Sequence, residues 1–290
     1  MKISNITVSI ALNDAERILQ KTSVATYKLD AKILLSHILN LTNSENLILK
    51  LNEKISLDDY LKYIHLIERR LKFEPVAYII GNKDFWKQKY TINNNVLIPR
   101  PETELIIELL LKKIKGKINS KLHILDLGTG SGCIILSLLS ELKFSTGIGI
   151  DISEKALNVA KLNAKKFDLI KRVNFKISDW FDNLENTDKF DIIISNPPYI
   201  PIDEWKNLDP NVLNFEPKGA LTDNRDGLEN YRIIANNAKK FLKKDGLIVL
   251  EMGFDQSNQI KEIFCAKGCG IEIFKDLQSI DRIVIIKDNL

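Results

Sequence analysis

The sequence Asn196-Pro197-Pro198-Tyr199 follows an apolar run and combines residue types that can hold a planar –NH2 group. An amide or aromatic amine nitrogen is a poor nucleophile because its lone pair is delocalised, so acceptors must orient and polarise it. Asn196 and Pro197 both precede a proline and are therefore restricted to extended dihedral angles. The Asn196 side-chain oxygen and the Pro197 carbonyl can each accept one N–H, and the Tyr199 ring can stack on the amide plane. A strand-ending turn without chemistry is the alternative, because these residue types also suit turns.

A glycine-rich loop is the second motif, with the sequence Asp-Leu-Gly-Thr-Gly-Ser-Gly at 126–132. Its glycines allow a tight turn and a close approach of the backbone to a ligand. Asp151 ends the next apolar run, where a carboxylate can accept both hydroxyls of a ribose. A dinucleotide fingerprint would need glycine at position 133, which is Cys133, so a pyrophosphate cofactor is disfavoured. The G-x-G-x-G spacing, preceded by Asp126, resembles the S-adenosylmethionine (AdoMet) loop of Rossmann-like methyltransferases.

The elements that must position these motifs form two patterns. Residues 6–73 show helical periodicity, and residues 76–99 carry apolar and aromatic runs broken by polar turns, which predicts a β-hairpin linker. Alternating strands and helices follow, which predicts a doubly wound, mostly parallel sheet with its ligands at the carboxyl ends of the strands. We therefore expect a helical domain over 1–74, the linker over 75–100 and an α/β domain over 101–290. The expected strands cover 122–127, 146–151, 173–178, 190–195, 246–252, 270–275 and 281–287.

Three further segments have two interpretations each. Asp179-Trp180 follows an expected strand and could bind the edge and face of an adenine, or could cap a helix and fill the core. Arg100 and Glu102 could border the cofactor or pair with each other. The polar stretch 201–214, followed by Phe-Glu-Pro at 215–217, could be a mobile flap over the substrate or a surface loop.

Composition limits the class of protein. With 44% hydrophobic and 28% charged residues, the 290-residue chain has the composition of an ordinary globular protein. The net charge of +4 is too small for a dedicated nucleic-acid binder. No apolar run reaches the ~18 residues of a membrane span and no signal-type core is visible, so we expect a cytoplasmic protein. Three cysteines are too few for a disulfide framework or a four-ligand zinc site, and we expect no metal.

Taken in order, the motifs resemble one family over nearly the whole chain. Ile98-Pro99-Arg100-Pro101-Glu102-Thr103-Glu104, the glycine loop and Asn-Pro-Pro-Tyr-Ile, after a helical segment and Tyr-Ile-Ile-Gly at 78–81, resemble the bacterial release factor glutamine methyltransferases of the HemK/PrmC family. The resemblance implies a Rossmann-like class I methyltransferase domain with a seven-stranded sheet. It also implies methylation of the side-chain amide nitrogen of the glutamine in the Gly-Gly-Gln tripeptide of class I peptide chain release factors.

By the same resemblance, Asn196, Pro197, Pro198 and Tyr199 hold the glutamine, and the N-terminal helices help to bind the release factor. The residues expected at the AdoMet site are Gly128, Thr129, Gly130, Ser131, Gly132, Asp151, Asp179, Trp180 and Asn196. Two alternatives remain. One is a nucleic-acid amino methyltransferase acting on adenine or guanine, which usually needs a basic surface that the near-neutral C-terminal part lacks. The other is a non-catalytic AdoMet-binding protein, which would not need an intact acceptor loop.

Overall fold

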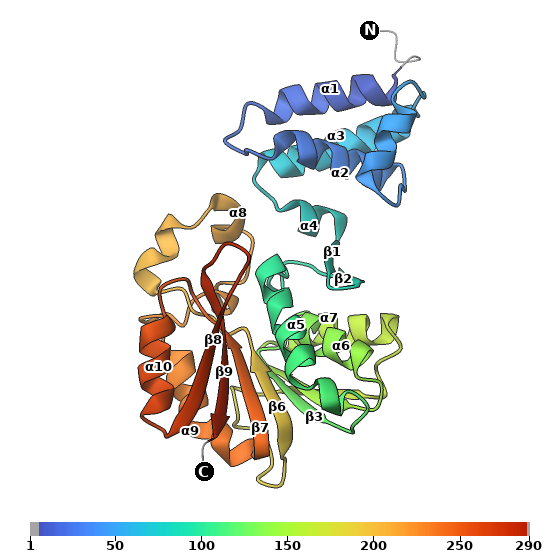
Figure 1. Ribbon diagram of the computed structural model, residues 1–290. Helices are drawn as coiled ribbons and strands as arrows, with labels where there is room; N and C mark the ends of the chain where they lie inside the picture. Colours follow the sequence, from blue (N-terminus) through green and yellow to red (C-terminus); the bar gives the residue numbers. More distant parts are fainter. Residues whose placement is uncertain (1–5, 289–290) are drawn as a thin grey trace. The chain divides into compact units, whose positions relative to one another are not determined.

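The computed structural model describes residues 6–288, and it divides into two compact units (Figure 1). The first unit runs to Gly81 and also contains Asp209–Phe215, although this short segment is remote in the sequence. The second unit begins at Asn82 and contains the rest of the chain. Residues 1–5 and 289–290, the outer ends of the two predicted domains, lie outside the described residues.

The first unit consists of helices packed on a small apolar core. Side-chain caps start several of them: at α1 the Thr7 hydroxyl accepts from the Ile10 N–H, and at α3 the Ser56 hydroxyl accepts from the Asp59 N–H. The buried core includes Leu34, Leu35 and the ring of Tyr63, whose hydroxyl donates to the Ala31 carbonyl. The elements are α1 (Val8–Leu19), α2 (Tyr27–Ile38), η2 (Ser44–Lys50), α3 (Leu57–Leu71), α4 (Val76–Ile80) and α8 (Pro210–Leu213).

A seven-stranded sheet forms the centre of the second unit, in the order β5-β4-β3-β6-β7-β9-β8. All neighbouring strands are parallel except at β9, which runs antiparallel to both β7 and β8. This confirms the predicted fold class. The strands are β3 (His123–Leu127), β4 (Thr146–Asp151), β5 (Val173–Ile177), β6 (Phe190–Ser195), β7 (Leu242–Glu251), β8 (Cys269–Lys275) and β9 (Asp281–Asp288).

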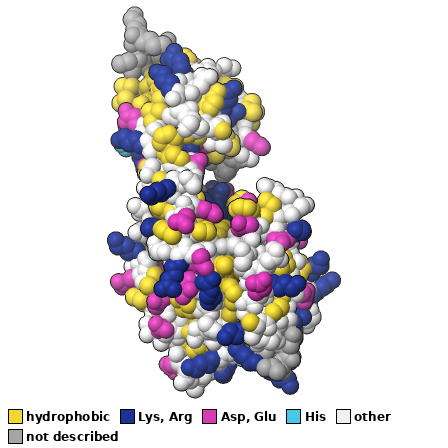
Figure 2. All heavy atoms as spheres, turned by 90° about the vertical axis from the view of Figure 1, so that its left-hand side faces the viewer, with side chains coloured by type: hydrophobic (Ala, Val, Ile, Leu, Met, Phe, Trp, Pro, Cys, Tyr) yellow, Lys and Arg dark blue, Asp and Glu magenta, His cyan; other side chains and the backbone are white. Residues whose placement is uncertain are grey.

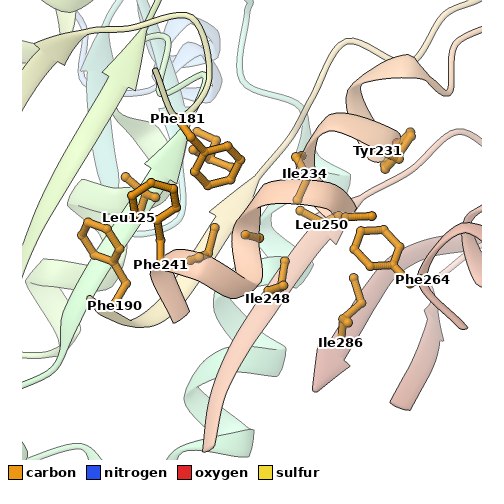
Figure 3. Packing of buried hydrophobic residues seen from close by; sticks show 14 of the residues in the cluster. Leu125, Phe181, Phe190, Tyr231, Ile234, Phe241, Ile248, Leu250, Phe264 and Ile286 are labelled. Atoms are coloured by element: carbon orange, nitrogen blue, oxygen red, sulfur yellow. The ribbon is translucent and has the colours of Figure 1, made fainter. Parts of the chain in front are cut away.

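Helices cover both faces of this sheet (Figure 1). One layer contains α5 (Glu104–Lys113), α6 (Cys133–Glu141) and α7 (Glu154–Lys166), and the other contains α9 (Glu229–Phe241) and α10 (Ser257–Cys265). Figure 3 shows the core between the sheet and the second layer, where the rings of Phe181 and Phe241 stack with centroids 5.2 Å apart. Because both faces are covered, the central strands are mostly apolar, and most of their polar residues lie near the strand ends.

The predicted hairpin is present but narrower than expected. It consists of β1 (Asn82–Phe85) and β2 (Gln88–Thr91), joined at Trp86, which has a positive φ of 55°. The preceding residues Val76–Ile80 form the short helix α4, where we expected part of the hairpin. Among the described residues, no helix is both long and apolar enough to span a membrane.

Candidate active site

The Asn196–Tyr199 loop leaves the end of β6 and is held in place by side chains from other loops and helices. Asn230 of α9 donates from Nδ2 to the Pro198 carbonyl at 2.7 Å. Gln256 donates from Nε2 to the Tyr199 carbonyl at 2.9 Å. Both proline peptide bonds are trans. Hydrogen bonds therefore occupy the carbonyls of Pro198 and Tyr199, whereas the described residues place no donor on the Pro197 carbonyl.

The Asn196 side chain is oriented by a buried threonine. Its Nδ2 donates to Thr103 Oγ1 at 3.2 Å, and Thr103 in turn donates to Glu251 Oε2 at 2.6 Å. No donor from the described part of the chain reaches Asn196 Oδ1. The loop thus presents two oxygens that accept no hydrogen bond from residues 6–288, one from a side chain and one from the backbone, which matches the two N–H groups of a primary amide.

A cavity of about 370 Å³ lies at the carboxyl ends of β3, β4, β5 and β6, within the size range of small-molecule sites. Its walls contain Gly128, Thr129, Gly130, Ser131, Asp151, Asp179, Trp180, Asn196 and Pro198, but not Gly132. A recess of about 30 Å³ is lined by Pro197 and Tyr199, and it shares Arg100 and Asn196 with the larger cavity. The fold therefore brings both sequence motifs to one place.

The glycine loop is shaped by backbone conformation and by one carboxylate. The glycines of this loop have positive φ values, which residues with a Cβ rarely adopt: 70° at Gly128, 55° at Gly130 and 79° at Gly132. Asp151 accepts the Gly130 N–H on Oδ2 and the Ser153 N–H on Oδ1, each at 2.9 Å. Each carboxylate oxygen thus keeps capacity for a further donor, such as a ribose hydroxyl.

Asp179 and Trp180 lie in a turn after β5, and no helix begins there, so the helix-cap interpretation is wrong. Asp179 is exposed and Trp180 is half-buried against the core. Trp180 has a positive φ of 46°, and its carbonyl accepts from the Ser178 hydroxyl at 2.8 Å. Strained backbone of this kind is common at ligand sites.

Two buried carboxyl groups beneath the cavity have raised pKa values. Burial raises the pKa of Asp126 to about 7, although a hydrogen bond from Thr129 partly opposes the shift. Burial likewise raises the pKa of Glu251 to about 7, opposed by the hydrogen bond from Thr103. Burial and the nearby Glu251 raise the pKa of the Tyr199 hydroxyl. The site therefore contains carboxyl groups that titrate near neutrality.

Arg100 forms its ion pair with Glu216 rather than with Glu102, which corrects the pairing considered from the sequence. Its Nη2 lies 2.6 Å from Glu216 Oε1, and the other oxygen of Glu216 accepts the Ile98 N–H at 3.0 Å. Glu216 is buried, and the preceding stretch contains η5 (Ile202–Asn207) and α8. The stretch for which the sequence allowed a mobile flap or a surface loop therefore contains short helices and ends at a buried, ion-paired glutamate.

The comparisons with known proteins agree with this geometry. A methyltransferase-domain model matches residues 118–271, and a PrmC N-terminal domain model matches residues 11–81. A release factor glutamine methyltransferase from Agrobacterium fabrum is 37% identical over 97% of both chains. The chain belongs to the release factor glutamine methyltransferase family.

Other relatives of this chain are longer proteins. A bifunctional methyltransferase from Rickettsia typhi is 42% identical over 95% of this chain, which spans about half (56%) of that relative's length. The hMettl16 catalytic domain, solved in complex with MAT2A 3'UTR hairpin 6, matches 80% of this chain and 86% of its own, with a TM-score of 0.55 and 17% identity. This last likeness concerns the fold alone.

The structure also adds site residues that the sequence reasoning missed: Thr103, Asn230, Glu251 and Gln256. Glu251 had a readable signal, because it ends the apolar run of β7 as Asp151 ends that of β4. Thr103 was read only as part of a family motif. Asn230 and Gln256 carried no local signal, since each acts on a loop that is distant in the sequence.

Proposed function

We propose that this chain transfers a methyl group from AdoMet to the side-chain amide nitrogen of the glutamine in the Gly-Gly-Gln tripeptide of class I peptide chain release factors. The pair of free acceptors, Asn196 Oδ1 and the Pro197 carbonyl, carries this proposal. Family membership supports the release factor as the substrate and the first unit as part of its binding surface. Such a substrate places the activity in the cytoplasm.

The residues around the larger cavity fit AdoMet. A Cβ added at Gly128 would meet no atom within 4 Å, so the loop leaves open space beside its backbone. The Ser131 hydroxyl is buried at the cavity wall, and the described residues provide no hydrogen-bond partner for it. We assign the ribose to Asp151 and the adenine to Asp179 and Trp180. When bound, AdoMet supplies an electrophilic sulfonium methyl group.

The chain's own contribution is position and polarisation. Asn196 Oδ1 and the Pro197 carbonyl accept the two amide protons, which orients the amide plane and increases the electron density on its nitrogen. The Tyr199 ring restricts the amide plane, and the hydrogen bonds from Asn230 and Gln256 keep the loop rigid. Preorganised acceptors of this kind are worth several kcal/mol when water is excluded. The nitrogen becomes acidic once its lone pair is used, so no strong base is required.

The face of the molecule shown in Figure 2 lacks the charge pattern expected of a nucleic-acid enzyme. On the face shown in Figure 2, lysine and arginine side chains are interspersed with aspartate and glutamate, and they form no continuous basic stripe. A base-flipping enzyme would be expected to carry such a stripe for the phosphate backbone.

The test is incubation with labelled AdoMet and a purified class I release factor, followed by peptide mass spectrometry. Asn196→Ala should lower kcat by roughly 10²–10³-fold while AdoMet binding, measured by calorimetry, is partly retained. Asn236→Ala, an exposed asparagine on α9, is the matched control and should retain the wild-type rate.

A release factor whose tripeptide glutamine is replaced should accept no label. Label in ribosomal RNA or DNA instead would show that the substrate is a nucleic acid and not a release factor. A wild-type rate for Asn196→Ala would contradict the acceptor role of this side chain.

A further inference from the structure

A chain of hydrogen bonds connects the acceptor loop to a carboxyl group that does not line the cavity. Asn196 Nδ2 donates to Thr103 Oγ1 at 3.2 Å, and Thr103 donates to Glu251 Oε2 at 2.6 Å. The other carboxylate oxygen accepts from the Tyr199 hydroxyl at 3.4 Å. Glu251 is only 2% exposed, and the main-chain carbonyl of the same residue accepts from Tyr231 at 2.9 Å. The carboxyl group is thus buried behind two residues of the acceptor loop.

The direction of these bonds follows from counting protons. An ionised carboxylate can only accept, so the single hydroxyl proton of Thr103 goes to Glu251. Thr103 Oγ1 must then accept from Asn196, and only the –NH2 end of an amide can donate. The –NH2 end of Asn196 is therefore turned toward Thr103, and Oδ1 is left for the substrate.

We propose that Thr103 and Glu251 are positioning residues that hold the Asn196 side-chain amide with its oxygen toward the acceptor nitrogen. This inference rests on the proposed function, because it takes Asn196 Oδ1 as an acceptor for a substrate N–H. We call the hydrogen bonds that join Glu251, Thr103 and Asn196 the relay. Without the relay, the two orientations of the Asn196 amide differ little in energy, and the reversed one presents a donor where an acceptor is needed.

Protonation of Glu251 removes the constraint. A neutral carboxyl can donate to Thr103, whose own proton is then free to turn toward Asn196 and to favour the reversed amide. Burial brings the pKa of Glu251 to about 7, so this change falls near neutrality. Besides burial, Arg282 lowers the pKa of this carboxyl group and Glu102 raises it. Glu251 in turn adds to the raised pKa values of Tyr199, Tyr231 and Cys133, which are also buried.

Paired substitutions at Thr103 test the relay. Thr103→Val keeps the shape but removes the hydroxyl, and we expect kcat to fall roughly 10–100-fold with smaller changes in KM for AdoMet and for the release factor. Thr103→Ser restores the hydroxyl and should return kcat to within about threefold of wild type. A Val variant with the wild-type kcat, or a Ser variant as slow as Val, would overturn the proposal.

The pH dependence of kcat in Glu251→Gln tests the relay, because a loss of packing alone would not change it. The wild-type kcat should decline as pH falls through about 7. This decline, the acidic limb of the pH profile, should be absent from the Gln variant, whose side chain cannot titrate. A limb that persists unchanged in the Gln variant would assign the titration to another group and overturn the relay.

A measurement without turnover separates this inference from the proposed function. The side-chain amide signals of Asn196, assigned by NMR with Asn196→Asp as reference, should shift with a midpoint near pH 7 in wild type and stay constant in Glu251→Gln. If no methyl reaches the release factor but the signals behave in this way, the proposed function fails and the relay stands. Signals that are insensitive to pH in both proteins would contradict the relay.

Discussion

Both units bury carboxyl groups, and the surroundings of Asp30 in the first unit differ from those of Glu251 in the second. In the first unit, Asp30 of α2 pairs with Arg70 of α3 at 2.7 Å, and both side chains are less than 9% exposed. Arg70 also donates to the Glu74 carbonyl and, at 2.6 Å, to Asn211 Oδ1 in α8. In the described part of the second unit, the donors to the Glu251 carboxylate are the hydroxyls of Thr103 and Tyr199, and no cation there forms a salt bridge with it.

This difference separates two uses of a buried charge. A carboxylate that is bonded to a guanidinium keeps one hydrogen-bond pattern, which suits the joining of helices and of a remote segment such as Asp209–Phe215. Burial raises the pKa of the Glu251 carboxyl group to about 7, and its hydroxyl partners allow it to reverse its hydrogen bonds when it gains a proton. The second arrangement is the one found beside the acceptor loop.

The largest effect on stability is expected from removal of the Arg70 guanidinium in the first unit. Arg70→Met leaves the Asp30 carboxylate buried without a counter-charge and should lower the free energy of unfolding of this unit by roughly 3–5 kcal/mol. Hydrogen exchange of the α2 and α3 amides measures it. Arg17→Ala, which removes an exposed pair with Asp14, is the control and should cost less than about 1 kcal/mol.

The double variant Asp30→Asn/Arg70→Met should recover at least half of the loss, because no unpaired charge remains. A loss for Arg70→Met no greater than that for Arg17→Ala would mean that the pair has no structural role, and the comparison would fail.

The second effect is the pH dependence of stability at Glu251. Its pKa is raised from 4.5 to about 7 by burial, so its contribution to stability is complete below pH 4.5 and is lost as pH rises through 7. Glu251→Gln lacks this loss. Its free energy of unfolding relative to wild type should therefore increase over that range by up to about 3 kcal/mol, measured by urea denaturation at several pH values.

Glu272→Gln is a control of opposite sign. The hydrogen bond from Lys113 lowers the pKa of Glu272, so this carboxylate stabilises the fold above its unfolded pKa and loses that contribution as pH falls. The pair is partly exposed, so the difference should stay well under 1 kcal/mol. The same pH trend in both variants would show that the response of Glu251 does not arise from its burial.

The smallest effect on stability is expected from a substitution of Asn211, which accepts a hydrogen bond from Arg70. Asn211→Ala removes one acceptor, while Asp30 and the Glu74 carbonyl remain, so the first unit should lose about 1 kcal/mol or less. Limited proteolysis should show faster cleavage within residues 201–217. Asn214→Ala changes an exposed residue of the same segment and should leave the cleavage rate as in wild type. Equal cleavage rates for the two variants would show that Asn211 does not anchor the segment.

Local sequence signals were sufficient for the sheet and for the polar residues at its strand ends. The strands predicted at 122–127, 146–151 and 190–195 correspond to β3, β4 and β6, since buried parallel strands are rich in apolar residues. The signal failed at Val76–Ile80, whose β-branched and aromatic residues favour a strand. There the helix follows Pro75 and ends at Gly81, which has a φ of 73°, and residue preference is outweighed by these ends and by packing on the helical core.

The sequence by itself determined the kinds of chemistry available: a proline-stiffened acceptor loop, a glycine loop and carboxylates at strand ends. These features depend on bonds and dihedral angles within a few residues, so they are readable in order along the chain. Only the tertiary structure decided their partners. Thr103 meets Glu251 across 148 positions and Arg100 meets Glu216 across 116. Burial and long-range contacts set the hydrogen-bond direction and pKa of a polar group, and neither is present until the chain has folded.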